Sequence, residues 1–251
     1  AQAGDHRGVA LGGIGEFGAG GGGLPAGGVD VVLDGEGHAV QRQLVQIAGC
    51  TFQCVGQGIE LGLAGQQGPI DWRLDYTYLH ATFRSAACLL AENNSTAGEG
   101  GCPDDEIRVS SGDYLPGLPK HHLKLGLGWN IDERLRLGTS VLAYSSQYVR
   151  GNENNRHRAN DEFEGRGRLP GYAVVNLTAD YRLARDWTLF GRVDNLFDKR
   201  YATGGALAEN PFVGAGNAFE SDPDEWRHEQ FIAPGAPRAG WLGVRYRWDA
   251  L

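Results

Sequence analysis

LPGYAVVNLTADYRLARDWTLFGRVDNLFDKRY, residues 169–201, contains two stretches in which apolar and polar side chains alternate. From Ala173 to Leu183 the odd positions are mainly apolar and the even positions are mainly polar. A period of two predicts a β-strand with one apolar and one polar face. Residues 183–186 form a short connection, and Trp187 and Val193 then share a face of a second strand. A hairpin of strands of about ten residues, with aromatic side chains near its ends, is typical of a transmembrane β-barrel.

The connections between predicted strands alternate between short and long. Short turns are expected at residues 65–68, 131–134 and 183–186, and long polar segments at residues 85–119, 151–168 and 202–234. Bacterial outer-membrane barrels show this asymmetry, with short periplasmic turns and long extracellular loops. The pattern predicts an all-β fold in which the three long segments lie outside the cell. The predicted strands after residue 56 lie in seven stretches: 59–64, 72–78, 121–130, 135–148, 173–183, 187–194 and 241–248.

Several separated blocks of the chain, in the same order, resemble TonB-dependent outer-membrane receptors. The signature VDNLFDKRYATGG (residues 193–205) and the ending PGAPRAGWLGVRYRW (residues 234–248) are similar to the last two strands of such receptors. The similarity continues in three further blocks, IELGLAGQQGPIDWRLDYTYLHATF (59–83), LPKHHLKLGLGW (118–129) and SSQYVRGNENNR (145–156). It covers roughly residues 56–248.

This resemblance implies an antiparallel up-and-down transmembrane β-barrel in the bacterial outer membrane, of which the chain is the C-terminal portion with about 7–10 strands. Receptors of this family carry a plug domain and a barrel of about 22 strands. We expect residues 56–251 to belong to that barrel. Residues 1–55 form a Gly-rich segment that matches poorly, although short alternating pieces at 29–33 and 40–47 predict further strands.

The resemblance also implies a function and a set of partners. It predicts energy-coupled uptake of a scarce nutrient, with a ferric siderophore as the favoured extracellular ligand. The partners would be the TonB complex, acting through a missing N-terminal part, the outer-membrane lipids and the barrel-assembly machinery. A small self-contained barrel acting as a passive pore or an adhesin is the alternative, and a soluble β-rich binding domain is a third reading.

Composition narrows the remaining classes of function. The 251 residues carry a net charge of -8, which argues against a nucleic-acid-binding face. The chain contains no Met and begins without an apolar signal segment, so we expect a processed chain or a fragment. Two GxGxxG matches in residues 13–23 fall in a Gly-rich run without a following helical pattern. No hydrolase, kinase or zinc motif is present, so we expect no enzyme, cofactor or metal site.

A set of signature residues is expected to support the fold rather than bind a ligand. Asp194 and Asn195 can bond neighbouring backbone, and Phe197 and Tyr201 fall where an aromatic belt or the base of a loop would lie. Trp248 resembles the terminal aromatic residue that the barrel-assembly machinery recognises, although three residues follow it. The family signature within this chain consists of Asp194, Asn195, Phe197, Asp198, Tyr201 and Trp248.

Ligand contacts are expected in the Arg- and Asn-rich loop after residue 147, where guanidinium and amide groups suit anionic or polyhydroxy ligands. The candidates are Tyr148, Arg150, Asn152, Asn155 and Arg156. Cys88 and Cys102 flank the polar stretch AENNSTAGEGG, and passage through the periplasm would permit a disulfide between them. Spacing alone leaves the pairing of the four cysteines open.

Overall fold

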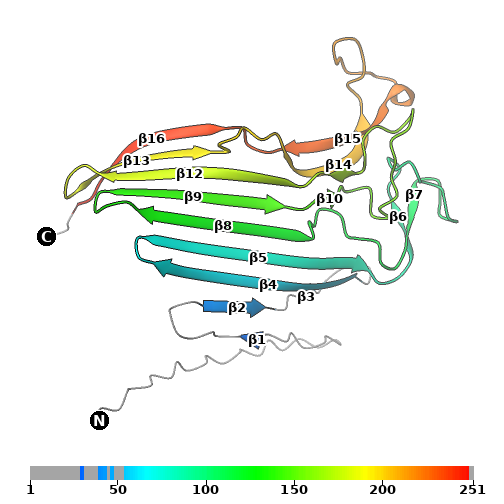
Figure 1. The fold of residues 1–251 in the computed structure, drawn as a ribbon. Coiled ribbons are helices and arrows are strands. Elements are labelled where there is room, and N and C mark those ends of the chain that lie inside the picture. The colour runs from blue at the N-terminus through cyan, green and yellow to red at the C-terminus, as the bar shows by residue number, and fades with distance from the viewer. Residues whose placement is uncertain (1–28, 31–38, 44–45, 48–53, 249–251) are drawn as a thin grey trace.

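The computed structural model describes residues 29–30, 39–43, 46–47 and 54–248, and these residues form an almost all-strand structure (Figure 1). They contain a 10-stranded sheet with the order β1-β2-β4-β5-β8-β9-β12-β13-β16, and β3 also pairs with β4. All neighbouring strands run antiparallel. The predicted all-β, antiparallel class is therefore confirmed. No helix in these residues is long and apolar enough to cross a membrane.

The sheet contains seven long strands and three short ones. The strands are β1 (Val29–Asp30), β2 (Ala39–Gln43), β3 (Gln46–Ile47), β4 (Cys54–Gln67), β5 (Ile70–Phe83), β8 (His121–Asn130), β9 (Leu135–Tyr144), β12 (Tyr172–Arg182), β13 (Trp187–Asp194) and β16 (Ala239–Tyr246). Each of the seven long strands overlaps one of the seven predicted strands, and β4 and β5 extend beyond the predicted 59–64 and 72–78 at both ends. The rest of the predicted N-terminal segment lies outside the described residues.

Three smaller hairpins lie within the long connections, which the sequence pattern had not predicted. They are β6 (Ala87–Leu90) with β7 (Glu106–Val109), β10 (Gln147–Tyr148) with β11 (Arg168–Leu169), and β14 (Ala202–Asn210) with β15 (Arg227–Pro234). A 3-10 turn, η1 (Pro223–Glu225), precedes β15.

The short turns lie at one end of the sheet and the long segments at the other (Figure 1). We call these the turn end and the loop end. The predicted turn at residues 65–68 is wrong, because the β4–β5 ladder continues to the pair Gln67 and Ile70. Gly68, with a φ of 57°, allows the chain to reverse within two residues.

Two further predicted strands end too late, at residues 148 and 248, and both errors have the same cause. A strand ends where its neighbours stop offering hydrogen bonds. β9 ends at Tyr144, opposite His122 and Tyr172 near the first residues of β8 and β12, so residues 147–148 pair with β11 instead. β16 ends at Tyr246, opposite Trp187, the first residue of β13.

The period of two gives the sheet an apolar face and a polar face. In the register Tyr76 is opposite Leu123, whereas the next pair along is Asp75 opposite Lys124. We call the apolar face the outward face and the polar face the inner face. Large apolar side chains on the outward face remain exposed, for example Leu125 at 38 % and Leu242 at 78 %. So continuous an exposed apolar surface is rare on a water-soluble protein, whereas it is the usual lipid-facing surface of a membrane barrel.

Aromatic side chains mark both ends of the outward face. Near the loop end the hydroxyl of Tyr76 lies 2.8 Å from Nδ1 of His121. Near the turn end the rings of Trp187 and Tyr246 lie 4.8 Å apart. Trp129 follows His121 by eight residues on β8, which is about 27 Å of strand at roughly 3.4 Å per residue. At a tilt of about 35–45°, a strand of that length rises about 19–22 Å along the membrane normal, which is most of an apolar band of about 25 Å.

Asn195 fixes the chain where β13 leaves the sheet. Its side chain is buried, and its Nδ2 donates to the carbonyls of Lys199 at 2.9 Å and Ala236 at 3.0 Å. Its Oδ1 accepts from the backbone N–H of Lys199, and its own N–H donates to Oδ1 of Asn176. Its φ of 49° lies in the left-handed region that Asn tolerates. One side chain thus joins the exit from β13 to the entry into β16.

The neighbouring signature residues make different contacts. Asp194 accepts from the guanidinium of Arg192 at 2.7 Å, so its carboxylate bonds a side chain where the sequence indicated backbone. Asp198 accepts from the backbone N–H of Arg238 at 3.0 Å, a second link between the same two connections. Phe197 is 73 % exposed.

We predict that Asn195→Ala lowers the free energy of unfolding by about 3 kcal/mol, because it removes three hydrogen bonds that the buried amide of Asn195 makes to the backbone of Lys199 and Ala236. Urea unfolding in detergent micelles, followed by tryptophan fluorescence, would measure the change. Asn217→Ala is the matched control, since Asn217 has a φ of 61° but an exposed side chain. Equal losses in the two variants would show that backbone strain, and not the hydrogen bonds, accounts for the effect.

Candidate functional site

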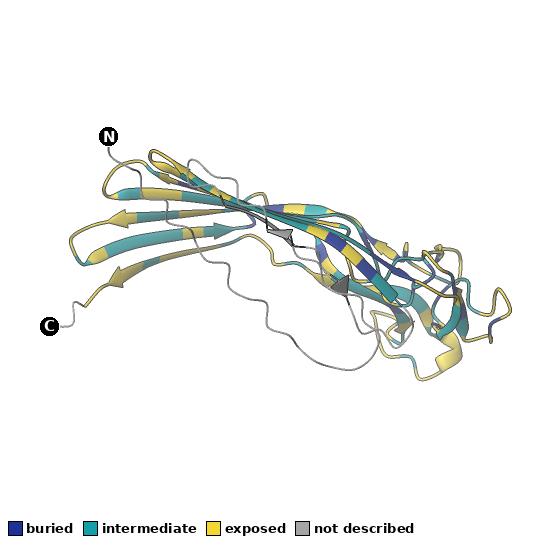
Figure 2. Ribbon diagram, turned by 90° about the horizontal axis from the view of Figure 1, so that it is seen from below, coloured by how far each residue is buried: buried dark blue, intermediate teal, exposed yellow. Residues whose placement is uncertain are grey.

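The three long connections pack into one structure at the loop end, which we call the outer body: residues 84–120, 145–171 and 195–238. Its second and third segments share a small apolar core of Val149, Leu169, Ala202 and Leu207. Figure 2 shows that buried residues gather toward this end of the molecule, whereas the turn end is largely exposed. The long connections are therefore folded and mutually packed.

Asparagine amides join the first two segments of the outer body. Nδ2 of Asn94 donates to the carbonyl of Gly151 at 2.7 Å. Asn155 is bonded at both ends of its amide to the backbone of Tyr114, since Nδ2 donates to the carbonyl at 2.9 Å and Oδ1 accepts from the N–H at 2.6 Å. These bonds replace the backbone pairing that a sheet would supply.

Asn152 performs the same role within the second segment. Its side chain is 1 % exposed, its Nδ2 donates to the carbonyl of Gly167 at 2.8 Å, and its Oδ1 accepts from the N–H of His157 at 3.0 Å. The amides of Asn152 and Asn155, both predicted ligand contacts, are thus engaged within the outer body. Their role toward a ligand remains a prediction that their present contacts do not favour.

The other three predicted ligand contacts lie nearer the surface. Arg150 and Arg156 are exposed, and Nη2 of Arg156 donates to Oγ of Ser110 at 3.3 Å. Tyr148 is half-buried, with the guanidinium of Arg168 lying 5.4 Å from its ring centre. Among the five candidates, only the two arginines are exposed, and the role of all five toward a ligand remains a prediction.

All three segments meet at a cluster of rings around Phe163. The ring of Phe163 stacks on His228 at 4.6 Å and meets the edge of His157 at 6.2 Å. Nδ1 of His228 lies 2.7 Å from Oδ1 of Asn93, and Nδ1 of His157 accepts the backbone N–H of Ser95 at 3.1 Å. Because each segment contributes to this cluster, its integrity determines whether the outer body holds together.

His157 is the titratable group that this cluster buries most deeply. Its side chain is 5 % exposed, and burial lowers its pKa, an effect that the backbone of Gly165 only partly offsets. The charged groups beside the cluster are Glu164 and Arg227, which form an ion pair at 3.6 Å, and the exposed Arg158. Protonation would also turn Nδ1 into a donor facing the N–H of Ser95.

We predict that acid loosens the outer body. A histidine whose pKa falls on folding binds fewer protons in the folded state, so its stabilising effect is complete above about pH 6.5 and is lost as the pH falls below that value. Limited proteolysis between pH 7.5 and pH 5, about one unit or more on each side of the ordinary histidine pKa, would follow cleavage within residues 84–238. His157→Gln should weaken this pH dependence; an unchanged dependence would contradict the assignment.

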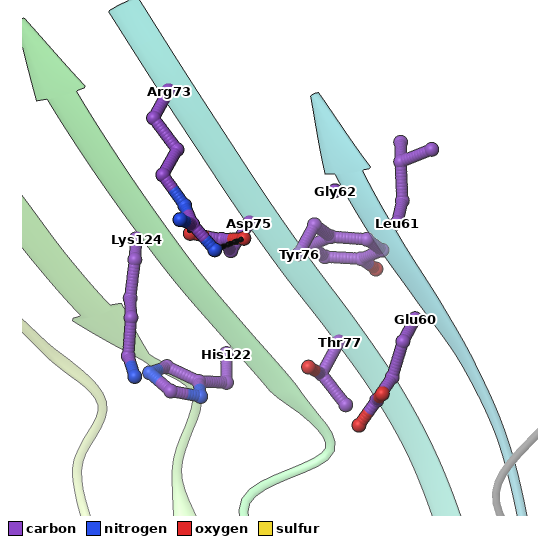
Figure 3. Close-up of a pocket in the computed structure, with 9 residues that line it drawn as sticks. All are labelled: Glu60, Leu61, Gly62, Arg73, Asp75, Tyr76, Thr77, His122 and Lys124. Atoms are coloured by element: carbon purple, nitrogen blue, oxygen red, sulfur yellow. Dashed lines mark hydrogen bonds and ion pairs between the residues drawn. The ribbon is translucent and has the colours of Figure 1, made fainter. Parts of the chain in front are cut away.

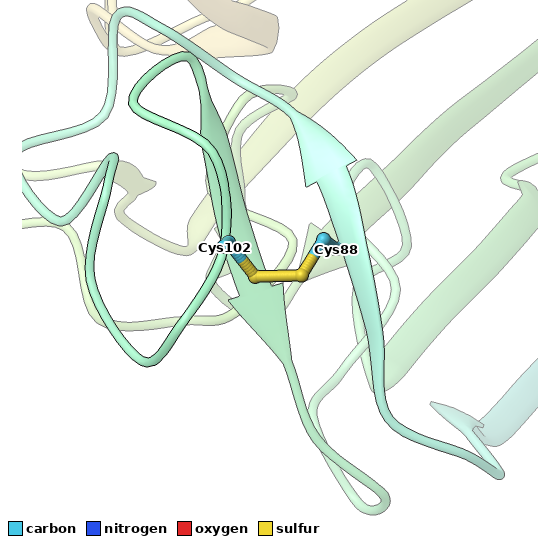
Figure 4. Close-up of a disulfide and its surroundings, with 2 residues drawn as sticks. All are labelled: Cys88 and Cys102. Atoms are coloured by element: carbon cyan, nitrogen blue, oxygen red, sulfur yellow. A yellow bond between two sulfur atoms is a disulfide. The ribbon is translucent and has the colours of Figure 1, made fainter.

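Cys88 and Cys102 form a disulfide within the first segment, with their Cα atoms 5.7 Å apart (Figure 4). The bond joins β6 to the turn that precedes β7, closing the polar stretch between them. Both cysteines lie in the same segment, so the bond stabilises one hairpin and does not connect it to the other segments.

The inner face of the sheet carries ion pairs between and along strands. Arg136 on β9 lies 2.7 Å from Asp71 on β5, across the intervening β8. Arg73 donates to both carboxylate oxygens of Asp75, at 2.8 and 3.0 Å. Arg245 lies 4.0 Å from Asp180. These partly exposed pairs contribute little stability individually, about 0–1 kcal/mol each, and they define a face suited to water and polar partners.

A hollow of about 390 Å³ opens on the inner face over β4, β5 and β8 (Figure 3). Its lining includes Glu60, Arg73, Asp75, Thr77, His122 and Lys124. Figure 3 shows Glu60 beyond Thr77 on one side, and His122 with Lys124 on the other. The sequence pattern did not single out Lys124 or Glu60 as site residues.

A row of rings begins at this hollow and runs across the inner face toward the outer body. His122 stacks on Tyr144 at 4.1 Å, Tyr144 lies 5.2 Å from Tyr172, and Tyr172 lies 4.4 Å from Tyr201. The first three are cross-strand neighbours in the register of β8, β9 and β12. We call these four residues the ring row. Sequence reasoning missed it, because single aromatic residues far apart in the chain become neighbours only through register.

Within the described part of the chain, no group of three or more His, Cys, Asp or Glu side chains could hold a metal ion. The hollow and the ring row instead offer hydroxyl, imidazole and ammonium groups. Such groups can offer hydrogen bonds and a positive charge to a ligand.

A curved antiparallel wall, with an apolar outward face, short turns at one end and a folded outer body at the other, defines the wall of an outer-membrane β-barrel. Residues 53–196 match the family model "TonB dependent receptor-like, beta-barrel". The chain belongs to this family. Its location is accordingly the bacterial outer membrane, with the turn end toward the periplasm and the outer body outside.

Curated relatives match parts of the chain. The ferric enterobactin receptor of Pseudomonas aeruginosa is 33% identical over 118 residues, which cover 45% of this chain and 15% of the relative. A probable TonB-dependent siderophore receptor, PiuA of Acinetobacter baumannii, is 29% identical over 169 residues, covering 65% of this chain and 20% of the relative. The matches thus span a fifth or less of these proteins.

Solved structures show the same fold. The siderophore receptor PiuA from Acinetobacter baumannii aligns over 83% of this chain and 25% of its own, with a TM-score of 0.53 and 18% identity. The ferric-catecholate import receptor Fiu from Escherichia coli K12 aligns over 83% of this chain and 24% of its own, with a TM-score of 0.50 and 19% identity. The aligned part of this chain therefore spans about a quarter of the length of these two solved chains.

Proposed function

We propose that this chain forms part of the wall and outer loops of a receptor that takes up a ferric siderophore across the outer membrane, driven by the TonB complex. The observation that carries the proposal is the family match over residues 53–196. The names of the curated relatives support the ligand class, since each is a receptor for a siderophore or its ferric complex. Residues 56–251 would belong to the C-terminal part of the barrel.

The structure supports a receptor that captures its ligand outside the cell. The outer body lies at one end of the sheet, and the inner face below it is polar and carries the ring row and the hollow. A ligand caught at the outer body would meet these groups next. Trp248, 82 % exposed beside Tyr246, is placed at the turn end, where we propose that the barrel-assembly machinery contacts it.

The proposal predicts a growth defect. A strain in which the gene encoding this chain is deleted should grow poorly on iron bound to a siderophore, and it should fail to accumulate radioactive iron from that complex. Growth with abundant free iron should be normal, since other routes then suffice. A deletion strain that accumulates iron from every ferric siderophore at the parental rate would contradict the proposed function.

A glycine pair tests whether uptake depends on the packed outer body. A Cβ at Gly167 would lie 2.5 Å from Nδ2 of Asn152 and 2.9 Å from Cβ of His157, both buried. Gly216 has a similar positive φ, 70° against 62°, but faces open space. We predict that Gly167→Ala reduces iron uptake about tenfold or more, because displacing these side chains disrupts the second segment and its contact with the first through His157 and Ser95. Gly216→Ala should change uptake much less; equal effects would contradict the prediction.

A further inference from the structure

The ring row presents polar atoms that the chain itself does not use. In the described part of the chain, the hydroxyls of Tyr144, Tyr172 and Tyr201 have no hydrogen-bond partner, although all three side chains are half-buried. Nε2 of His122 is buried and likewise lacks a partner there. Polar groups in such surroundings usually find a partner, in protein, in water or in a ligand. Three of them lie on the adjacent strands β8, β9 and β12, and Tyr201 lies beside them in the connection after β13. Together they form a row of free hydrogen-bonding groups that a molecule rich in oxygen atoms would satisfy.

The spacing of the row is fixed by the sheet. His122, Tyr144 and Tyr172 are direct cross-strand neighbours, so their side chains repeat at the strand spacing of about 4.8 Å. Stacking leaves ring edges, and not ring faces, free along most of the row. A ligand must therefore approach the hydroxyl edge, where each phenol can donate one hydrogen bond.

Lys124 adds a positive charge at the hollow end of the row. It lies two residues from His122 on the same face of β8, opposite Asp75 in the register. Both oxygens of Asp75 accept from Arg73, and the described residues form no ion pair with Lys124 within 4.0 Å. Asp75 therefore shares its charge between the two cations, and the ammonium of Lys124 can also attract an incoming anion. Glu60, the acidic group in the hollow outside this pair, lies on the far side of Thr77 (Figure 3).

We propose that the ring row and Lys124 form a binding site on the barrel wall for the anionic, catecholate class of ferric chelate. The inference rests on the proposed function and narrows its ligand. Catecholates surround ferric iron with oxygen atoms and leave the complex strongly negative, whereas hydroxamates leave it neutral or nearly so. The phenol donors would bond the ligand oxygens, and Lys124 would favour the negative complex over the neutral one.

The test measures binding of two chelates to the protein expressed from its natural gene and purified in detergent. Ferric enterobactin is the catecholate probe, and a ferric trihydroxamate is the neutral probe; quenching of tryptophan fluorescence reports binding. Tyr144→Phe and Tyr172→Phe remove one hydroxyl each and keep the ring. Each should weaken binding of ferric enterobactin about five- to tenfold, and Lys124→Gln about tenfold. Tyr181→Phe, on the outward face, is the matched control and should have no effect.

The outcomes separate this inference from the proposed function. Weaker binding of ferric enterobactin in the three variants, with the control unchanged, supports both. Tight binding that none of the three variants alters overturns the wall site and leaves the proposed function standing. A protein that prefers the trihydroxamate, with the Lys124 variant unaffected, overturns the assigned class. Absence of binding to any ferric chelate overturns both. Heat-modifiable migration on a gel verifies that each variant is folded.

Discussion

The structure depends on one constraint, which is that backbone N–H and C=O groups in hydrocarbon need partners within the protein. Antiparallel pairing meets this need along seven long strands, and the period of two then assigns alternate side chains to lipid and to the interior. The exposed Leu125 and Leu242 on the outward face and the ion pairs of Arg136 and Arg245 on the inner face are two results of that single constraint.

The outer body meets the same need by different means. In water the backbone can bond solvent, so its segments have no obligation to form sheets. They pack around only a small apolar core, and the amides of Asn94, Asn152 and Asn155 supply many of the bonds between and within them. Asparagine suits the second segment, residues 145–171, because its short amide has both a donor and an acceptor and can bond the backbone through each.

The parts of the fold that the sequence predicted are those governed by period and by local turns. The strands around residues 121–130 and 173–182 follow from alternation alone, and so do their faces. Strand ends were less predictable, since β9 stops at Tyr144 where its partners begin. The site residues were hard to predict for the same reason. The sequence predicts Asn152 as a ligand contact, but tertiary packing buries its side chain against Gly167. The ring row depends on the register between β8, β9 and β12, and that register could not be predicted from one sequence.

The position of the Cys88–Cys102 disulfide has a consequence for how the outer body can come apart. The bond closes one hairpin on itself, while the contacts that the described residues make among the three segments are non-covalent: hydrogen bonds, stacked rings, an ion pair and the small apolar core. Each segment can therefore separate from its neighbours and return without any redox chemistry. The disulfide keeps the hairpin of the first segment closed while its non-covalent contacts with the other segments break and form again.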